Sequence, residues 1–482
     1  MSQTRDNNSE FGFDYPPSLE SLPVSFKESY GLFINNSFSA PGELFESLDP
    51  SSGRVISKLT KANKSDVGRA FKAARAAQPA WAALPGGVRG QYLFKIARLL
   101  GERMREGAVI EAIDGGKVIS EARDIDLPLA VQHFFYYAGW ADKLDFACPD
   151  IKKPVPLGVV GAIIPWNFPM LMLAWKIAPA LACGNTIVLK PAETTSLGAM
   201  WFCEIILAAG LPKGVVNIIT GDGQTGEEMV KNNQVDKIAF TGSTSVGKKI
   251  ASLTNKATLE LGGKSANIVF ADCAIDQAVE SIIEGIFFNR GHVCCAGSRL
   301  LVEESIEEVI ISKLKRRMDT LIVGPALDKN SDIGPINSLS QLNTIKDLVK
   351  SAEMEGASVY QSASALPRGG LWFKPTLLID VTPAMRVARE EIFGPVLSVM
   401  TFRTPDEAIS LANSSPYGLA AGVWTNKGSK ALEVTARLKA GVVWQNSYNL
   451  FDAASPFGGI KESGYGREGG IQGLRDYLGE GV

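Results

Sequence analysis

The stretch LGVVGAIIPWNFPMLMLAWKIAPALACGNTIVLK, residues 157–190, contains the pattern that decides the fold. Residues 157–164 are an unbroken apolar run rich in β-branched side chains, which is typical of a strand buried on both faces. Residues 170–183 have the length of a helix, and residues 184–190 return to a strand pattern. A strand, a helix and a second buried strand form a βαβ unit, so this stretch predicts a parallel sheet.

The alternation continues on both sides of that stretch. Further strand and helix patterns occupy residues 197–210, 214–220, 226–232 and 236–241. A second alternating region follows, with strands at 265–270, 298–303 and 395–402 and helices at 275–288 and 305–319, and long amphipathic helices at 65–84 and 90–113 precede both regions. The chain is therefore predicted to be α/β. Right-handed crossovers bring the carboxyl ends of such strands to one edge of the sheet, where ligands bind.

Composition excludes several classes of protein. Apolar residues make up 45% and charged residues 21% of the 482 residues, as in an ordinary globular protein of about two or three domains. The net charge is −2 and no basic block stands out, which argues against a nucleic-acid partner. Residues 157–189 are apolar, but prolines and a glycine interrupt them, which favours buried structure over a membrane span. Residues 1–22 lack the apolar core of a signal peptide and predict a polar surface tail, so a cytoplasmic location is expected.

The motif NRGHVCCAGSR, residues 289–299, contains two adjacent cysteines. The chain has six cysteines, without a CxxC pair, and two histidines, His133 and His292. This set is too sparse for a usual zinc site, and we expect reduced thiols and no metal. A disulfide between Cys294 and Cys295 would close a strained ring. From the residues alone, the pair is either buried core or a nucleophile.

Three loops at predicted strand ends could bind phosphate or ribose. GDGQTG (221–226) matches G-x-G-x-x-G, but no acidic residue follows at the end of the next strand, and tight-turn glycines explain it equally well. In FTGSTSVGKKI (240–250), Gly242 frees the backbone and Ser243 offers a hydroxyl at the start of a helix, which suits an anion. In KPAE (190–193), Lys190 and Glu193 are spaced to bind ribose hydroxyls; a capping glutamate beside a surface lysine is the alternative.

Eight motifs follow one another along the chain: PWNFP (165–169), KPAE (190–193), FTGSTSVG (240–247), LELGGKS (259–265), GHVCCAGSR (291–299), EEIFGPV (390–396), WQNSYN (444–449) and PFGGIKESGYGRE (456–468). Together they resemble the NAD(P)-dependent aldehyde dehydrogenase superfamily, in the family's order and at close to its spacing, from about residue 30 onwards. The resemblance implies oxidation of an aldehyde to a carboxylic acid through a thiohemiacetal and a thioester on cysteine.

The resemblance assigns three catalytic residues. Cys294 is the implied nucleophile, since a thiolate is both a strong nucleophile and a good leaving group. The side-chain amide of Asn167 and the backbone N–H of Cys294 are the implied oxyanion donors. Glu260, 34 positions before Cys294, is the implied general base that activates water for hydrolysis.

The resemblance also assigns binding residues. NAD is the implied cofactor, with NADP possible, held by Trp166, Lys190, Glu193, Gly242, Ser243, Glu391 and Phe393. The implied substrate tunnel is formed by Met172, Trp175, Val293, Cys295, Phe451 and Phe457. These tunnel residues include no arginine, which favours an aliphatic or aromatic aldehyde over a semialdehyde that carries a carboxylate. His292 departs from the family's usual residue, and we expect it to support the loop rather than to act in a cysteine–histidine dyad.

The implied architecture is a Rossmann-like parallel-sheet cofactor domain interleaved with a second α/β catalytic domain and a small oligomerisation arm. The expected boundaries are 1–127 and 154–260 for the NAD-binding domain, with about the first 25 residues a tail, 261–448 for the catalytic thiol domain, and 128–153 and 449–482 for the arm and the C-terminal return. A homo-oligomer, dimer or tetramer, is expected, with residues 133–150 as the candidate arm. Family members commonly continue past LRDYL (474–478) into a strand that pairs across subunits, and only four residues follow this motif here. The segment between FTGST and LELGG is also shorter than usual, which predicts a shortened helix after residue 243.

Three other functions remain as alternatives. An acylating dehydrogenase would pass the thioester to coenzyme A, but Glu260 favours water as the acceptor. A catalytically silent NAD-binding structural or regulatory protein is disfavoured by the intact Cys294, Asn167 and Glu260. A cysteine hydrolase finds no support outside the cysteine–histidine pair.

Overall fold

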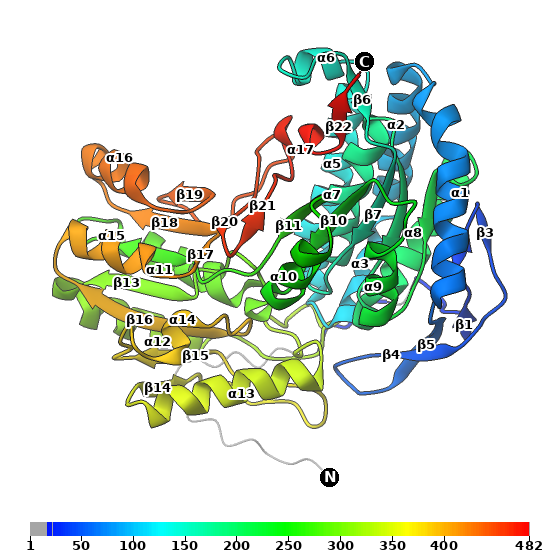
Figure 1. Ribbon diagram of the computed structural model, residues 1–482. Coiled ribbons are helices and arrows are strands. Elements are labelled where there is room, and N and C mark those ends of the chain that lie inside the picture. Colours follow the sequence, from blue (N-terminus) through cyan, green and yellow to red (C-terminus); the bar gives the residue numbers. More distant parts are fainter. Residues whose placement is uncertain (1–16, 22, 482) are drawn as a thin grey trace, which may run out of the picture.

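The computed structural model describes residues 17–21 and 23–481, so most of the predicted N-terminal tail lies outside the described residues. Figure 1 shows two sheet-based layers side by side, joined by loops and by the C-terminal segment. This arrangement confirms the predicted α/β class with parallel sheets.

The first sheet has the order β21-β11-β10-β7-β8-β9-β2-β3. Its five central strands are parallel, and they are β7 (Val159–Ile163), β8 (Thr186–Lys190), β9 (Val216–Ile218), β10 (Lys237–Thr241) and β11 (Ala257–Glu260). Its edge strands are antiparallel: β21 (Gly464–Tyr465) at one side, β2 (Phe33–Ile34) and β3 (Ser37–Phe38) at the other. The helices that follow the parallel strands are α7 (Pro169–Ala182), α8 (Leu197–Ala209), α9 (Gly223–Val230) and α10 (Thr244–Leu253). The predicted βαβ pattern of residues 157–241 is therefore present.

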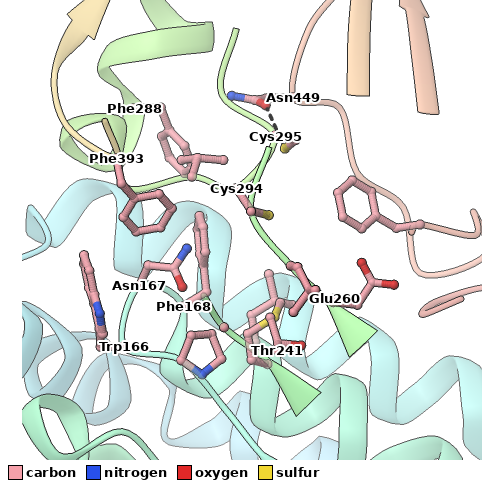
Figure 2. Close-up of a pocket in the computed structure, with 18 of the residues that line it drawn as sticks. Trp166, Asn167, Phe168, Thr241, Glu260, Phe288, Cys294, Cys295, Phe393 and Asn449 are labelled. Carbon is pink, nitrogen blue, oxygen red and sulfur yellow. Dashed lines mark hydrogen bonds between the residues drawn. The ribbon is translucent and has the colours of Figure 1, made fainter. Parts of the chain in front are cut away.

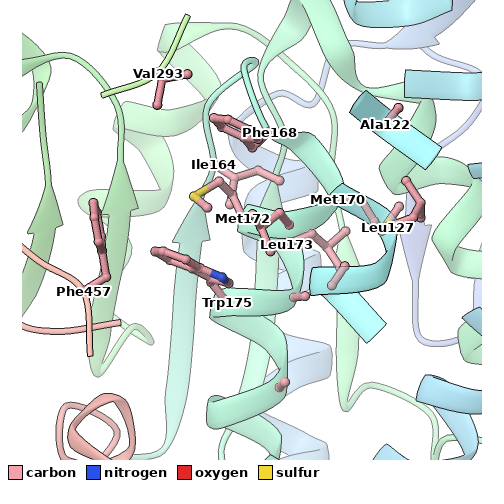
Figure 3. Packing of buried hydrophobic residues seen from close by; sticks show 14 of the residues in the cluster. Ala122, Leu127, Ile164, Phe168, Met170, Met172, Leu173, Trp175, Val293 and Phe457 are labelled. Carbon is pink, nitrogen blue, oxygen red and sulfur yellow. The ribbon is translucent and has the colours of Figure 1, made fainter. Parts of the chain in front are cut away.

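Both faces of this sheet are buried. Successive side chains of β7 point to opposite faces, and all of them are buried. Val159 and Ile163 pack with α1 (Lys64–Ala82), α9 and α10, whereas Val160 and Ala162 pack toward α7 and α8. All residues of α7 are buried, which explains why its sequence is apolar on every side. Figure 3 shows Met172 and Trp175 of α7 turned toward Val293 and Phe457 from other parts of the chain.

An outer helical layer covers α7 and α8. It consists of α2 (Gly86–Glu102), α3 (Met104–Gly115) and α5 (Leu127–Trp140). The single helix predicted for 90–113 is wrong, because Arg103 leaves the helical conformation (φ −111°, ψ 17°) and its guanidinium binds Glu106 and Glu204. Residues 127–140 pack against α2 and α7, so only α6 (Leu144–Ala147) and the residues around it project from the body in the predicted arm 128–153.

The second sheet has the order β14-β15-β16-β13-β12-β18-β19. Its strands are β12 (Ala266–Val269), β13 (Arg299–Glu303), β14 (Ser358–Gln361), β15 (Thr376–Ile379), β16 (Val396–Phe402), β18 (Ala420–Trp424) and β19 (Val442–Gln445). All pairs are parallel except β14 with β15. Its helices are α11 (Ile275–Phe287), α12 (Glu307–Met318), α13 (Leu339–Met354), α14 (Arg386–Arg389), α15 (Pro405–Asn413) and α16 (Gly428–Arg437).

The C-terminal segment connects the two sheets. Strand β20 (Ile460–Lys461) pairs with β17 (Tyr417–Gly418) beside the second sheet, and β21 then pairs with β11 of the first. After α17 (Gln472–Arg475), β22 (Leu478–Glu480) pairs with β6 (Pro154–Pro156) of the same chain. The residues after LRDYL thus include a short strand, and it is paired within the chain.

The remaining strands form a three-stranded sheet at the N-terminal side, of order β1-β5-β4. They are β1 (Ser29–Tyr30), β4 (Leu44–Leu48) and β5 (Val55–Thr60). Across the described part of the chain, every helix is too short or too polar to cross a bilayer.

Candidate active site

A cavity of about 490 Å³ lies where the carboxyl ends of β7, β10 and β11 face the second domain. It is lined by these predicted site residues: Trp166, Asn167, Met172, Trp175, Gly242, Ser243, Glu260, Val293, Cys294, Cys295, Glu391, Phe393, Phe451 and Phe457. The position follows from the fold, because parallel strands bring their carboxyl ends to one edge. Figure 2 shows several of these side chains around the cavity.

Two predicted cofactor residues, Lys190 and Glu193, do not line this cavity. The Lys190 ammonium is buried and donates to the carbonyl oxygens of Pro191 (2.7 Å) and Gly221 (2.8 Å). Burial lowers the pKa of Lys190 to about 8. The Glu193 side chain is 53% exposed, and its carboxylate lies 4.0 Å from the Lys190 Nζ. The two side chains are therefore neighbours at the end of β8, outside the cavity lining.

The adjacent cysteines diverge, as the alternation of side chains in an extended loop predicts. Cys294 is half-buried and faces the cavity, whereas the Cys295 Sγ points to the Asn449 Oδ1 at 3.5 Å (Figure 2). The neighbouring Cys295 thiol and burial raise the pKa of Cys294 well above its ordinary value. All six cysteines are free thiols, and no cluster of described residues could hold a metal ion.

An unusual backbone conformation presents Cys294. Three consecutive residues before it, Asn289, Arg290 and Gly291, have left-handed φ angles of 48°, 60° and 72°. Non-glycine residues rarely adopt this conformation, so tertiary contacts must impose it. The buried Arg290 guanidinium donates to the carbonyl oxygens of Gly115 (3.0 Å) and Pro335 (2.9 Å), which anchors the loop to α3.

Asn167 lies beside this loop and is held by it. Its Nδ2 donates to the His292 carbonyl at 2.9 Å, and the Asn289 Nδ2 donates to the Asn167 carbonyl at 2.8 Å. An amide nitrogen carries two hydrogens, so the Asn167 side chain retains a second donor. Figure 2 shows Asn167 and Cys294 on the same side of the cavity, which suits an oxyanion on a carbon bonded to the Cys294 sulfur.

Glu260 ends β11 and is buried, and neither of its carboxylate oxygens has a hydrogen-bond partner in the described structure. Burial and the nearby Glu468 raise its pKa well above the ordinary value, although the Lys176 ammonium opposes this rise. Gly458 packs closely against this side chain, since a Cβ at residue 458 would lie 2.8 Å from Oε1. A buried, unpartnered carboxylate is costly in free energy, which is typical of a functional group rather than a structural one.

The β10–α10 side of the cavity is suited to an anionic, hydroxyl-rich ligand. Ser243 caps α10 and accepts from the Val246 N–H at 3.4 Å. The hydroxyls of Thr241 and Thr244 are buried, and neither has a partner among the described residues. Free hydroxyls and the N-terminus of a helix favour phosphate or ribose, so this side fits the predicted cofactor.

Glu391 closes the same side of the cavity. Its carboxylate accepts from the Gly263 N–H at 3.0 Å, and a Cβ at Gly262 would collide with it. Burial raises the pKa of Glu391 to about 7. The carboxylate therefore remains available to accept from ligand hydroxyls when it is ionised.

His292 packs behind the cavity and is not part of its lining. Its ring stacks on Phe393 at 5.6 Å and meets Trp166 edge-on at 4.7 Å. Burial lowers the pKa of His292 well below its ordinary value, so the ring is neutral and its Nδ1–H donates to the Phe393 carbonyl at 2.7 Å. This position accords with the predicted supporting role and separates the ring from any dyad with Cys294.

Sequence reasoning missed several residues that line the cavity. They are Ile125, Leu129, Pro165, Phe168, Leu171, Thr241, Leu261, Gly262, Glu284, Phe288, Gln341, Thr344, Ile392, Tyr448, Asn449 and Leu450. Many of these residues adjoin one of the eight motifs in the sequence, so proximity to a motif could have identified them. Glu284 and Phe288 lie outside every motif, but they are four residues apart, Glu284 in the last turn of α11 and Phe288 at its C-cap, which brings both to the same end of the helix.

A parallel sheet whose strand ends meet a thiol, an amide and an unpartnered carboxylate defines an α/β enzyme with a cysteine at its centre. The family model described as the aldehyde dehydrogenase family matches residues 38–480. The chain is 44% identical to retinal dehydrogenase 2 of Homo sapiens, covering 96% of this chain and 92% of that protein. It is 42% identical to an aldehyde dehydrogenase of Emericella nidulans, covering 95% and 96% of the two chains. The structure of an aldehyde dehydrogenase from Bacillus cereus in complex with NAD⁺ superposes with a TM-score of 0.90 at 40% identity, covering 94% of this chain and 95% of that one.

The chain therefore belongs to the aldehyde dehydrogenase family. This result confirms the predicted class of enzyme, an NAD(P)-dependent aldehyde dehydrogenase, and the predicted NAD chemistry.

Proposed function

We propose that this protein oxidises an aldehyde to the acid in two stages, acylation of Cys294 and hydrolysis of the resulting thioester. One observation carries the proposal: the Cys294 thiol, the Asn167 amide and the Glu260 carboxylate all line one cavity. The proposal deepens the established family assignment by giving each group a role.

In the first stage, the Cys294 sulfur bonds to the aldehyde carbon, and the carbonyl oxygen becomes an oxyanion. The free Asn167 N–H and the backbone N–H of Cys294 stabilise that charge, at about 3–4 kcal/mol for a good donor. A bound nicotinamide would supply the hydride acceptor for the thiohemiacetal carbon. The thiol must first lose its proton, and because its pKa is raised, acylation is expected to accelerate as pH rises.

In the second stage, Glu260 removes a proton from water, and the resulting hydroxide attacks the thioester. Its carboxylate has no competing partner among the described residues and lies at the same cavity as Cys294. Hydrolysis releases the acid and regenerates the thiol. An enzyme that transferred the acyl group to coenzyme A would gain nothing from such a base, so Glu260 favours water as the acceptor.

NAD is the preferred cofactor in this proposal. The exposed Glu193 carboxylate would repel the 2′-phosphate of NADP, and the Lys190 ammonium is already bound to two backbone carbonyls. The substrate half of the cavity supports an aliphatic or aromatic aldehyde, since Met172, Trp175 and Val293 are apolar. The free state of all six cysteines supports a reducing, cytoplasmic location.

The test compares the two adjacent thiols. Cys294→Ser should abolish aldehyde-dependent formation of NADH, because an alcohol is a far weaker nucleophile than a thiolate. Cys295→Ser changes an equally small side chain that faces Asn449, and it should retain much of the activity. Absorbance of the reduced cofactor measures both. The reverse pattern would show that Cys295, and not Cys294, is the nucleophile.

A further inference from the structure

The charged side chains that line the cavity are all carboxylates. They are Glu260, Glu284 and Glu391, and no lysine, arginine or histidine is among the described lining residues. Glu260 and Glu391 belong to the machinery described above. Glu284 has no place in that machinery.

Glu284 is the third member of an acidic stripe on α11. Asp276, Glu280 and Glu284 are spaced four residues apart and so share one face of the helix. Asp276 pairs with Lys313 (2.7 Å) and Glu280 pairs with Arg317 (2.9 Å), both on α12. Glu284 is exposed, and no cation of the described chain lies within ion-pair distance of it.

The position of Glu284 on its helix is unfavourable for a carboxylate. It lies in the last turn of α11, where the Phe288 N–H already bonds to its backbone carbonyl. The carboxyl end of a helix carries partial negative charge, which disfavours an anion and favours a cation. Both the side chain and the helix end therefore place negative potential at this part of the cavity.

Aromatic rings line the same cavity as Glu284. Phe288 lies one turn further on, and Phe451, Phe457 and Trp175 form a chain of ring contacts at 5.5 and 5.6 Å. Ring faces attract ammonium groups, and most strongly where water is excluded. Aromatic rings and an unpaired carboxylate in one cavity thus suit an apolar chain that ends in a cation.

We propose that Glu284 selects aldehydes whose far end carries an ammonium group. The inference rests on the proposed function, since the aldehyde end must reach Cys294. A substrate with a carboxylate at the far end would be repelled by the same group, and an uncharged substrate would be neither attracted nor repelled.

The experiment uses three aldehydes of equal chain length that end in a trimethylammonium, a tert-butyl or a carboxylate group. The first two have the same shape and differ in charge, and a quaternary ammonium cannot titrate. In Glu284→Gln, the ratio of kcat/KM for the cationic aldehyde to kcat/KM for the tert-butyl aldehyde should fall about three- to tenfold, as expected for one solvent-exposed charge pair. The loss should appear in KM, because a distant charge contributes equally before and during reaction.

The matched control is Glu280→Gln, which removes the same charge from the same helix one turn away from the cavity. It should leave the ratio unchanged. Raising the salt concentration should reduce the ratio in the wild type and have little effect in Glu284→Gln.

The outcomes separate the two proposals. If none of the three aldehydes reduces NAD, the proposed function itself is wrong. If the tert-butyl aldehyde is oxidised but Glu284→Gln leaves the ratio at the wild-type value, or if Glu280→Gln lowers it equally, the role of Glu284 is overturned.

Discussion

At the residue scale, the most informative side chain is Glu260, because a carboxylate without partners is held in a buried position next to a thiol. Its raised pKa means that it ionises at higher pH than an ordinary glutamate, so that its ionised fraction grows as pH rises through a higher range than usual. The neighbouring Lys176–Glu468 ion pair, also buried, contributes opposing charges to the same region. The pKa of Glu260 is therefore shifted by groups on α7 and on the segment before α17.

We expect Glu260→Gln to produce a rapid burst of NADH followed by a slow steady rate. Glutamine retains the shape but cannot accept a proton from water, so the thioester should accumulate, with a loss of about 10²–10⁴-fold in turnover. In the wild type, the steady rate should increase with pH as the carboxylate ionises. Rapid-mixing absorbance measurements across pH would show both effects, and a turnover in Glu260→Gln equal to the wild type would rule out this role.

Much of the site was predictable at this scale, because the motifs place Cys294 and Asn167 on loops and Glu260 at a strand end, and a parallel sheet brings these together. The positions of Lys190 and Glu193 outside the cavity lining were not predictable. A spacing of three residues does not reveal the direction in which the chain leaves the end of a strand. Tyr448 was also missed, although its hydroxyl donates to the Cys295 carbonyl at 2.9 Å. An aromatic residue at such a position is indistinguishable in sequence from a core residue.

At the element scale, the left-handed run at residues 289–291 is the feature that presents Cys294, the proposed nucleophile. Apolar periodicity predicts α11 but not the conformation of the three residues beyond it, because that conformation depends on distant partners. Arg290 reaches α3, and Glu121 accepts from the Asn289 N–H at 3.0 Å. The elements before and after this loop were thus predictable, whereas the loop itself was not.

We expect Asn289→Ala to lower kcat and thermal stability together. The change removes both donors from the Asn289 amide, one of which holds the Asn167 carbonyl, and it forces alanine into a left-handed conformation that costs about 1–2 kcal/mol. Asn289→Gly is the matched variant, because glycine adopts that conformation freely but supplies no donor.

Asn289→Gly should therefore recover part of the melting temperature without recovering kcat. Thermal melts and steady-state kinetics on the two variants measure this separation. Equal melting temperatures for the two would contradict the assignment of backbone strain, and a normal kcat in either would contradict the role of the Asn167 contact.

At the scale of the whole molecule, the two α/β layers and their order were predictable from the alternation of strands and helices, and so was a site at the strand ends. It was less predictable that residues 128–153 would form a separate arm. Residues 127–140 are apolar enough to bury one face against α2 and α7, and only the segment around α6 projects. Sequence alone does not reveal which apolar residues find a partner within the chain.

The exposed apolar residues near α6 support the predicted homo-oligomer. Phe146 is 78% exposed, and Val155 on the nearby β6 is also exposed in a sheet of only two strands, which has open edges. We expect the protein to be a dimer or tetramer by light scattering and Phe146→Asp to shift it to smaller species. Leu432→Asp, an equally exposed site on α16, is the control. A wild-type protein that is monomeric at micromolar concentration would contradict this expectation.

The passage of the C-terminal segment between the two sheets has a consequence for synthesis on the ribosome. Strand β21 covers the edge of β11, Gly458 leaves the space that Glu260 occupies, and Glu468 pairs with Lys176 of α7. These residues are translated almost 200 positions after Glu260 itself. The nascent chain can therefore build most of both sheets while Glu260, the proposed base, still lacks the surroundings that shift its pKa. The surroundings of Glu260 are completed only when this segment emerges and crosses from one sheet to the other.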